Sequence, residues 1–166
     1  MKECGIYFGK ETFYELIRSV GGMWNDSKER PIVCLIQSIE CKELFWAIPL
    51  GDWNHRNEKA KKRINKYLKF PEDDIRSCYY HIGNTTTKSI FFVSDAIPIT
   101  EKYIEREYIN RQTGRIHIIK NKKLIKELTK KLSRILAYEN SQKNSFRQHI
   151  TDVKSFLLEE IQSNQR

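Results

Sequence analysis

Short apolar runs rich in β-branched and aromatic residues constrain the fold of this chain more than any other feature of its sequence. The runs at 31–36 and 44–48 are bounded by polar residues and have the composition of buried strands. Only a polar stretch around 40–43 separates them, so we expect them to pair antiparallel. Residues 78–80 and 90–93 predict two further strands, joined as a hairpin with Gly83-Asn84 as the turn signal.

Segments with apolar residues at helical spacing surround these strands. We expect a helix over 11–18 that closes at Gly21-Gly22, a loop through 25–27, and a helix around 60–68 stopped by Pro71. A helix capped by Thr100 that breaks near 113–114, a brief strand at 115–119 and two C-terminal helices complete the pattern. We therefore predict one α+β domain over residues 1–166, with a compact, mainly antiparallel β-barrel or sheet core and flanking helices.

The positive charge of the chain is concentrated in two segments. The formal net charge is +9, and lysine and arginine gather at 56–69 and again at 120–134. Such blocks attract polyphosphates at long range, although a solvated helix face has the same composition. Two blocks in one small domain favour a nucleic-acid partner.

The remaining composition excludes several classes of protein. Four cysteines show no C-x-x-C pair and lie in or beside apolar runs, which indicates reduced, largely buried thiols rather than a disulfide framework or a metal site. No apolar stretch is long enough to cross a bilayer, and the first residues lack the pattern of a secretory signal. We expect a cytoplasmic protein without metal or other cofactor.

The polar segment 81–89 has the residue types of an active site. His81 can exchange a proton near neutral pH, Lys88 can neutralise a phosphoryl oxygen, and Thr86 and Ser89 can donate hydrogen bonds to charge that develops on phosphorus. A polar hairpin whose threonines simply favour strands would look the same. His117 and His149 lie on apolar runs and are interpreted as structural residues.

Three features in order resemble the ToxN/AbiQ-like endoribonuclease toxins of type III toxin–antitoxin systems, with the CptN branch nearest. They are a basic residue before a buried strand at 28–33, the Ile48-Pro49-Leu50 strand end followed by a polar loop with His55, and a later strand ending Ile97-Pro98-Ile99. The resemblance implies a MazF/Kid-like barrel and metal-independent RNA cleavage in phage defence. It also implies inhibition by a pseudoknot RNA antitoxin cut from tandem repeats, in a closed protein–RNA hetero-oligomer.

The chain departs from this family directly after the Pro-Leu strand end. ToxN has a Thr-Ser pair and a lysine there, whereas this chain continues Gly51-Asp52-Trp53-Asn54-His55-Arg56. We therefore assign the chemistry to the 81–89 segment. His81 serves as acid or base, Lys88 stabilises charge, and Thr86 and Ser89 donate to the scissile phosphate. The products would be a 2′,3′-cyclic phosphate and a 5′-hydroxyl.

A wider set of residues is expected to contact RNA. The expected contacts are Tyr7, by family analogy, and Arg30, His55, Arg56, Lys59, Lys62, Arg63, Lys66, Lys123 and Lys126. Aromatic residues interleaved with this charge could stack on unpaired bases. A non-catalytic RNA-binding regulator would use the same basic surface and is the alternative to the nuclease.

Overall fold

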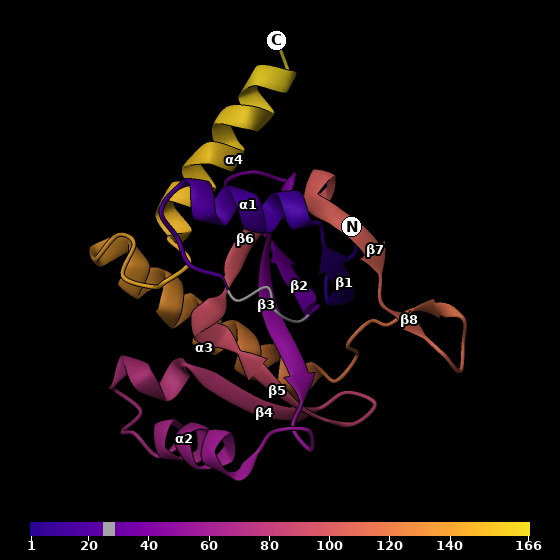
Figure 1. The fold of residues 1–166 in the computed structure, drawn as a ribbon, viewed down its shortest axis with the longest axis vertical. Helices are drawn as coiled ribbons and strands as arrows, with labels where there is room; N and C mark the ends of the chain where they lie inside the picture. The colour runs from indigo at the N-terminus through magenta and orange to yellow at the C-terminus, as the bar shows by residue number, and fades with distance from the viewer. Residues whose placement is uncertain (25–28) are drawn as a thin grey trace.

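A seven-stranded antiparallel sheet forms the centre of the computed structural model, which describes residues 1–24 and 29–166 (Figure 1). Its strand order is β4-β5-β3-β2-β1-β7, and β6 pairs with the first half of β3. The strands are β1 (Gly5–Gly9), β2 (Pro31–Gln37), β3 (Leu44–Asp52), β4 (Tyr80–Asn84), β5 (Lys88–Phe92), β6 (Ile97–Thr100) and β7 (Ile104–Glu107). Within the described residues the sheet does not close into a barrel, so the α+β prediction is confirmed with an open sheet as its core.

Among the described residues, four α-helices flank the sheet, in segments where apolar spacing predicted helices. They are α1 (Glu11–Ser19), α2 (Glu58–Leu68), α3 (Lys122–Ser141) and α4 (Ile150–Asn164). The asparagine before α2 and the one before α3 cap them: Asn57 Oδ1 accepts from Ala60 N at 2.8 Å, and Asn121 Oδ1 accepts from Leu124 N at 3.1 Å. Both α2 and α3 contact β4, while α4 packs on β6 and extends past the body of the molecule (Figure 1). No helix in the described parts of the chain is long and apolar enough to span a membrane.

The predicted hairpin forms as β4 and β5, but β4 shares only Tyr80 with the strand predicted at 78–80, and the turn differs. Gly83 and Asn84 pair with Ser89 and Lys88 inside the ladder, and residues 85–87 make the connection. Gly83 is needed within the strand because a Cβ there would lie 2.5 Å from Leu124 Cδ1 of α3. The glycine therefore serves the approach of a helix rather than a turn.

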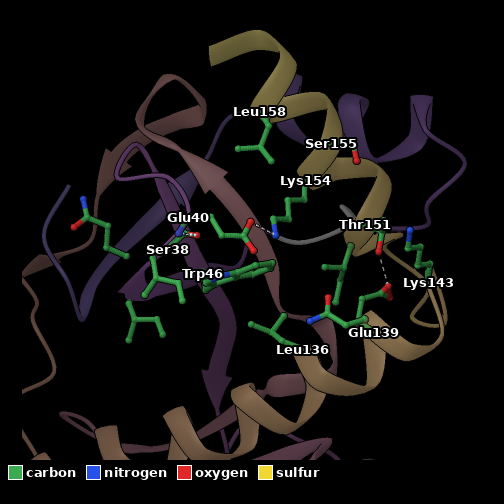
Figure 2. A pocket seen from close by; sticks show the side chains of 15 residues that line it. Ser38, Glu40, Trp46, Leu136, Glu139, Lys143, Thr151, Lys154, Ser155 and Leu158 are labelled. Atoms are coloured by element: carbon green, nitrogen blue, oxygen red, sulfur yellow. Dashed lines mark hydrogen bonds and ion pairs between the residues drawn. The ribbon is translucent and has the colours of Figure 1, made fainter. Parts of the chain in front are cut away.

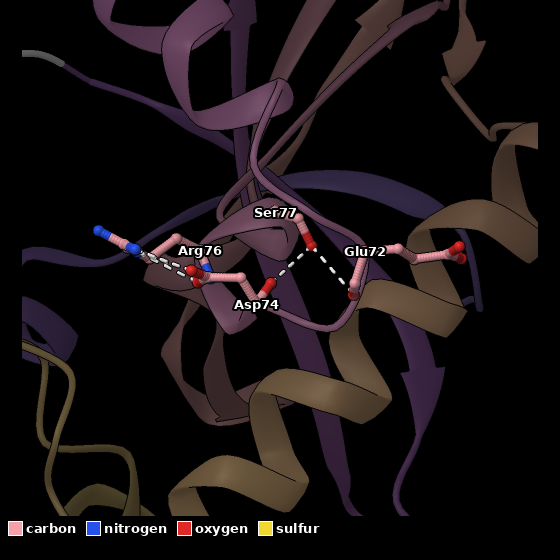
Figure 3. Close-up of polar contacts among 4 residues, drawn as sticks. All are labelled: Glu72, Asp74, Arg76 and Ser77. Carbon is pink, nitrogen blue, oxygen red and sulfur yellow. Dashed lines mark hydrogen bonds and ion pairs between the residues drawn. The ribbon is translucent and has the colours of Figure 1, made fainter.

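The segment before this hairpin is a 3-10 helix, η1 (Ile75–Cys78), rather than the start of a strand. Asp74 caps it, since its Oδ1 accepts from Arg76 N at 2.9 Å, and the same carboxylate pairs with the Arg76 guanidinium (Figure 3). Ser77 Oγ donates to the Asp74 carbonyl at 2.7 Å. These local bonds offer the backbone an alternative to extended pairing, which the apolar character of 78–80 did not reveal.

The prediction of a helix after Thr100 is also wrong. Only a 3-10 turn, η3 (Glu101–Tyr103), forms there, and the chain then continues as β7 along the edge of β1. A small two-stranded sheet follows, made of β8 (Ile109–Asn110) and β9 (Arg115–Ile116), and a further 3-10 turn, η2 (Val93–Asp95), joins β5 to β6. Pairing with β1 overrides helical spacing in this segment. The loop predicted at 25–27 lies outside the described residues.

Candidate functional site

The two faces of the β4–β5 hairpin separate the residues that the sequence had grouped. His81 lies opposite Phe91 and Gly83 opposite Ser89, so these four share one face. Lys88 lies opposite Asn84, on the other face. Contacts agree with this assignment, because His81 meets Glu127 of α3 whereas the Lys88 ammonium lies over the ring of Trp53. The structure does not bring His81 and Lys88 together.

His81 and α3 form a polar cluster on the first face. The His81 Nε2 atom lies 3.1 Å from Glu127 Oε2, and Lys131 Nζ donates to the Tyr80 carbonyl at 2.7 Å. Burial lowers the pKa of His81, nearby Lys131 lowers it further, and Glu127 opposes both. Together with Arg134 and others these side chains line a cavity of about 300 Å³.

On the opposite face, two ammonium groups lie over one tryptophan. Lys88 Nζ and Lys61 Nζ are each 5.6 Å from the Trp53 ring centroid, within the range of a cation–π contact. Trp53 is itself buried against Ile64 of α2 and the β5 residues Ile90 and Phe92. This packing fixes the ring, so that Lys88 is held at the same face of the hairpin as α2.

Arg30 and Arg56 converge on the ring of Phe92, at the end of β5. Their Cζ atoms lie 5.0 and 5.5 Å from the ring centroid. Arg56 Nε also donates to the Asp52 carbonyl at 3.3 Å. A Cβ on Gly51 would stand 2.5 Å from an Nη atom of Arg56, so the glycine allows the guanidinium to lie close against β3. We call Arg30, Arg56 and Phe92 the arginine cluster.

The arginine cluster has more positive charge than its surroundings neutralise. The carboxylate that acts on Arg30 is that of Asp95, which accepts two bonds from Arg147, at 3.0 and 2.7 Å. Neither Arg30 nor Arg56 has a carboxylate partner among the described residues. Burial lowers the pKa of Arg30, and Arg56 and Arg147 lower it further against the opposing effect of Asp95. An anion bound here would relieve an unfavourable concentration of charge.

Further residues expected to contact RNA lie around the arginine cluster. His55 is 82% exposed and its Nε2 is 3.9 Å from Asp52 Oδ2, in the loop between β3 and α2. Burial raises the pKa of Tyr80, which Arg63 of α2 opposes. Three other basic residues of α2 expose their side chains: Lys59, Lys62 and Lys66.

The remaining candidates lie elsewhere. The Tyr7 side chain is buried, and its hydroxyl accepts from Lys2 N at 2.7 Å. Ser89 is buried as well, with its Oγ 2.9 Å from Thr85 Oγ1, while Thr86 is exposed at the hairpin tip. Two lysines, Lys123 and Lys126, are exposed on α3.

Sequence reasoning missed Phe92 of the arginine cluster and the ion pair that lies beside the cluster. Phe92 was assigned only as a strand residue, and its role as the ring beneath two guanidinium groups depends on a fold that brings residues 30, 56 and 92 together. The Asp95–Arg147 pair joins residues 52 positions apart, and no pattern in the sequence signals it. Both depend on contacts between residues far apart in the sequence, which the residue types alone do not indicate.

A separate cavity of about 430 Å³ lies between β2–β3 and the helices α3 and α4 (Figure 2). Trp46 and Leu136 form apolar walls, Lys154 pairs with Glu40, and Thr151 donates to Glu139. The residues lining this cavity include none of the predicted site residues. It is therefore distinct from the arginine cluster.

Comparisons with known proteins identify a fold. No family model matches the chain, and no curated protein matches it in sequence. Among solved structures, the chain is similar to AbiQ, described as a lactococcal anti-phage endoribonuclease belonging to the type III toxin–antitoxin system. The alignment covers 99% of this chain and 100% of AbiQ, with a TM-score of 0.62 and 10% sequence identity. The chain thus has the AbiQ fold, a likeness that does not distinguish the CptN branch.

Proposed function

We propose that this protein is an endoribonuclease toxin of a type III toxin–antitoxin system, and that it holds the scissile phosphate of RNA at the arginine cluster. The observation that carries the proposal is the convergence of Arg30 and Arg56 on one ring without a carboxylate partner among the described residues. Guanidinium groups match phosphate oxygens in shape and charge. The AbiQ fold over the whole chain supports the same class of activity.

Cleavage through the 2′-hydroxyl needs a base, stabilisation of the charge on phosphorus and an acid for the leaving 5′-oxygen. Arg30 and Arg56 stabilise the phosphorane oxygens, and Lys88 adds a cation on the same face of the hairpin. His55, next to Arg56 in sequence and near Asp52, is the imidazole on this side. His55 accepts the proton of the attacking 2′-hydroxyl and solvent water protonates the leaving 5′-oxygen, which gives a 2′,3′-cyclic phosphate and a 5′-hydroxyl without a metal ion.

His81 is the second candidate for proton transfer. Its contact with Glu127 would orient the imidazole, and its lowered pKa favours the neutral form that a general base requires. Because it occupies the opposite face of the hairpin, it would act on RNA bound along α3. Thr86 and Ser89 belong to this second arrangement. Substitution of His55 and substitution of His81 therefore distinguish the two arrangements, because only one of the two should abolish cleavage.

The partners follow from the same reasoning. We propose one ribonuclease domain over residues 1–166 in the cytoplasm, held inactive by a pseudoknot RNA antitoxin that it cuts from tandem repeats, in a closed protein–RNA assembly. The exposed lysines of α2 and α3 supply the cationic surface for such a partner. Placement in the CptN branch and a role in phage defence belong to this proposal.

The test is incubation of purified protein, shown to be free of copurified RNA, with mixed-sequence single-stranded RNA in excess EDTA. We expect RNA cleavage with cyclic phosphate ends and no cleavage of matched DNA. Arg30→Gln and Arg56→Gln should each slow cleavage about 100-fold, in line with the loss of an oxyanion donor. Lys42→Gln removes one exposed positive charge elsewhere and should leave the rate unchanged.

Two results would change the assignment. Loss of cleavage in His81→Gln but not in His55→Gln would move the proton-transfer step to the α3 face of the hairpin. RNA that binds tightly yet remains intact with the wild-type protein would favour the non-catalytic regulator.

A further inference from the structure

Two hairpins enclose a groove on one side of the molecule. The tip of the β4–β5 hairpin and the β8–β9 hairpin both extend to the same side (Figure 1). Between them lie a cavity of about 740 Å³ and a neighbouring one of about 580 Å³. Asn110 and His117 line both, while Thr85 lines the first and Thr86 the second. We call these the polar chamber and the aromatic chamber of the hairpin groove.

The polar chamber is cationic without any acidic residue in its lining. Lys2, Arg115 and Lys120 line it, and no aspartate or glutamate does. None of these three cations has an ion pair among the described residues. A cavity of this charge and size suits an anionic ligand as large as a nucleotide.

Uncharged hydrogen-bonding groups in the polar chamber could read the edge of a base. Asn110 Oδ1 accepts from Gln112 N at 2.9 Å, which holds its side chain in place and leaves the amide nitrogen as a donor. The Asn84 side chain is exposed and makes no hydrogen bond to the described residues. Burial lowers the pKa of His117, so its neutral ring offers one donor and one acceptor. Asparagine amides can pair with two atoms of a base at once.

The aromatic chamber provides a surface for stacking. The rings of Phe8 and Tyr108 lie 5.7 Å apart, and Tyr108 is 38% exposed. The Arg106 guanidinium lies 3.8 Å from the Phe8 ring centroid and pairs with Glu29 at 2.7 Å. Exposed aromatic rings beside arginine are the usual platform for unpaired bases.

Two segments of the chain connect the groove with the arginine cluster. Phe8 of β1 lies opposite Pro31 of β2, the residue that directly follows Arg30. Arg30 is therefore one residue along the chain from the position that pairs with Phe8 in the wall of the aromatic chamber. On the other side, Lys88 follows the hairpin tip and lies at Trp53. A chain of nucleotides held at the arginine cluster could therefore extend into the groove.

We propose that the hairpin groove reads the base sequence of single-stranded RNA, with Asn110, His117 and Asn84 contacting the edge of one unpaired base and Tyr108 stacking on the next. This inference rests on the proposed ribonuclease function and adds to it the residues that determine sequence specificity. The arginine cluster binds any phosphate, whereas the groove selects which phosphate is placed there.

Binding selection from a random pool of single-stranded 2′-fluoro RNA tests the groove independently of cleavage, because this RNA lacks the attacking hydroxyl. We expect the wild-type protein to prefer one base about ten-fold at one or two adjacent positions. Asn110→Asp keeps the oxygen that accepts from Gln112 and removes the amide donor, so it should abolish or change the preference at one position. His117→Asn and Asn84→Ala should reduce the preference as well.

Two controls separate sequence reading from general attraction. Arg115→Gln should weaken all sequences alike, as expected for a phosphate contact, and Lys42→Gln should change nothing. Asn84→Ala keeps the test valid if the other variants fail to fold, because the Asn84 side chain makes no bond that folding needs.

The outcomes distinguish this inference from the proposed function. Base preference in the wild type that is lost in the groove variants supports the groove, even if natural RNA is never cleaved and the nuclease proposal fails. If all sequences bind within about two-fold, or if the preference is retained in all three variants, the proposal that the groove reads sequence is refuted. Cleavage at the arginine cluster is not affected by that result.

Discussion

Replacing Arg30 by methionine should make the protein more stable while it removes the proposed phosphate contact. The methionine side chain can keep the contact with Phe92, because a thioether packs on an aromatic ring with an energy similar to that of an exposed cation–π contact. What changes is the charge. Burial and two neighbouring arginines lower the pKa of Arg30, which means that the folded state disfavours its positive charge relative to the unfolded state.

The distances set the size of the effect. The Arg30 and Arg56 Cζ atoms lie 5.0 and 5.5 Å from one ring centroid, so they are no more than about 10.5 Å apart. At that largest separation Coulomb's law gives the smallest repulsion, about 0.4 kcal/mol in bulk water and about 1.6 kcal/mol at an effective dielectric constant near 20. Since both side chains are partly exposed, we expect Arg30→Met to raise the free energy of unfolding by about 0.5 to 1 kcal/mol.

Urea denaturation at low and high salt measures this change. The gain should be largest near 0.05 M salt and should shrink in about 1 M salt, where the Debye length falls to about 3 Å. Arg106→Met is the matched control, because Arg106 also lies on a ring, that of Phe8, but pairs with Glu29 at 2.7 Å. Arg106→Met should not stabilise the protein. An Arg30→Met protein less stable than wild type at low salt would refute the argument that Arg30 carries an unneutralised charge.

Two further predictions concern glycines and pH. Gly51→Ala should displace the Arg56 guanidinium and slow RNA cleavage at least ten-fold, with less than about 1 kcal/mol change in the free energy of unfolding. Gly22→Ala should lower the free energy of unfolding by about 2 kcal/mol, because its Cβ would lie 2.8 Å from the Gln148 backbone oxygen. Urea titrations and cleavage rates measure both effects, and equal losses of stability in the two variants would contradict the prediction. Burial lowers the pKa of His117, so the unfolded state binds the proton more readily and the free energy of unfolding should fall as pH decreases below about 6.5. His117→Asn should reduce this fall between pH 7.5 and 5.5, as measured by urea titrations. An unchanged pH dependence in the variant would contradict the prediction.

Local pattern predicted the elements whose residues also pack locally. The strands at 31–36 and 44–48 form β2 and β3 in the expected antiparallel pair. The four α-helices of the described residues form close to their predicted apolar stripes because the spacing of their buried residues matches the helix period. The segment 101–108 failed for the opposite reason. Ile104 and Tyr108 have helical spacing, but β7 pairs with β1 at the edge of the sheet, and this long-range pairing is not visible in the spacing of residues within the segment.

The candidate site was predicted in part. Arg30 and Arg56 were predicted as RNA contacts, and the structure places both guanidinium groups at the ring of Phe92. Their meeting point was not predictable, because Phe92 reaches them through pairing between β3 and β5. The predicted grouping of His81 with Lys88 depended on the assumption that Gly83-Asn84 forms the turn of the hairpin.

The position of the turn decides which polar residues share a face. A two-residue turn at Gly83-Asn84 would place His81 opposite Thr86 and Tyr79 opposite Lys88, so His81 and Lys88 would lie on the same face. The connection instead uses residues 85–87, and Lys88 lies opposite Asn84. This change in register moves Lys88 to the face of His81's neighbours in sequence, Tyr80 and Ile82, because side chains alternate along a strand. Leu124 favours this register, because its side chain packs against Gly83 at a distance that leaves no room for a Cβ. A helix far along the chain thus places Lys88 beside Trp53 and α2, on the side of the hairpin where Arg30 and Arg56 meet at Phe92.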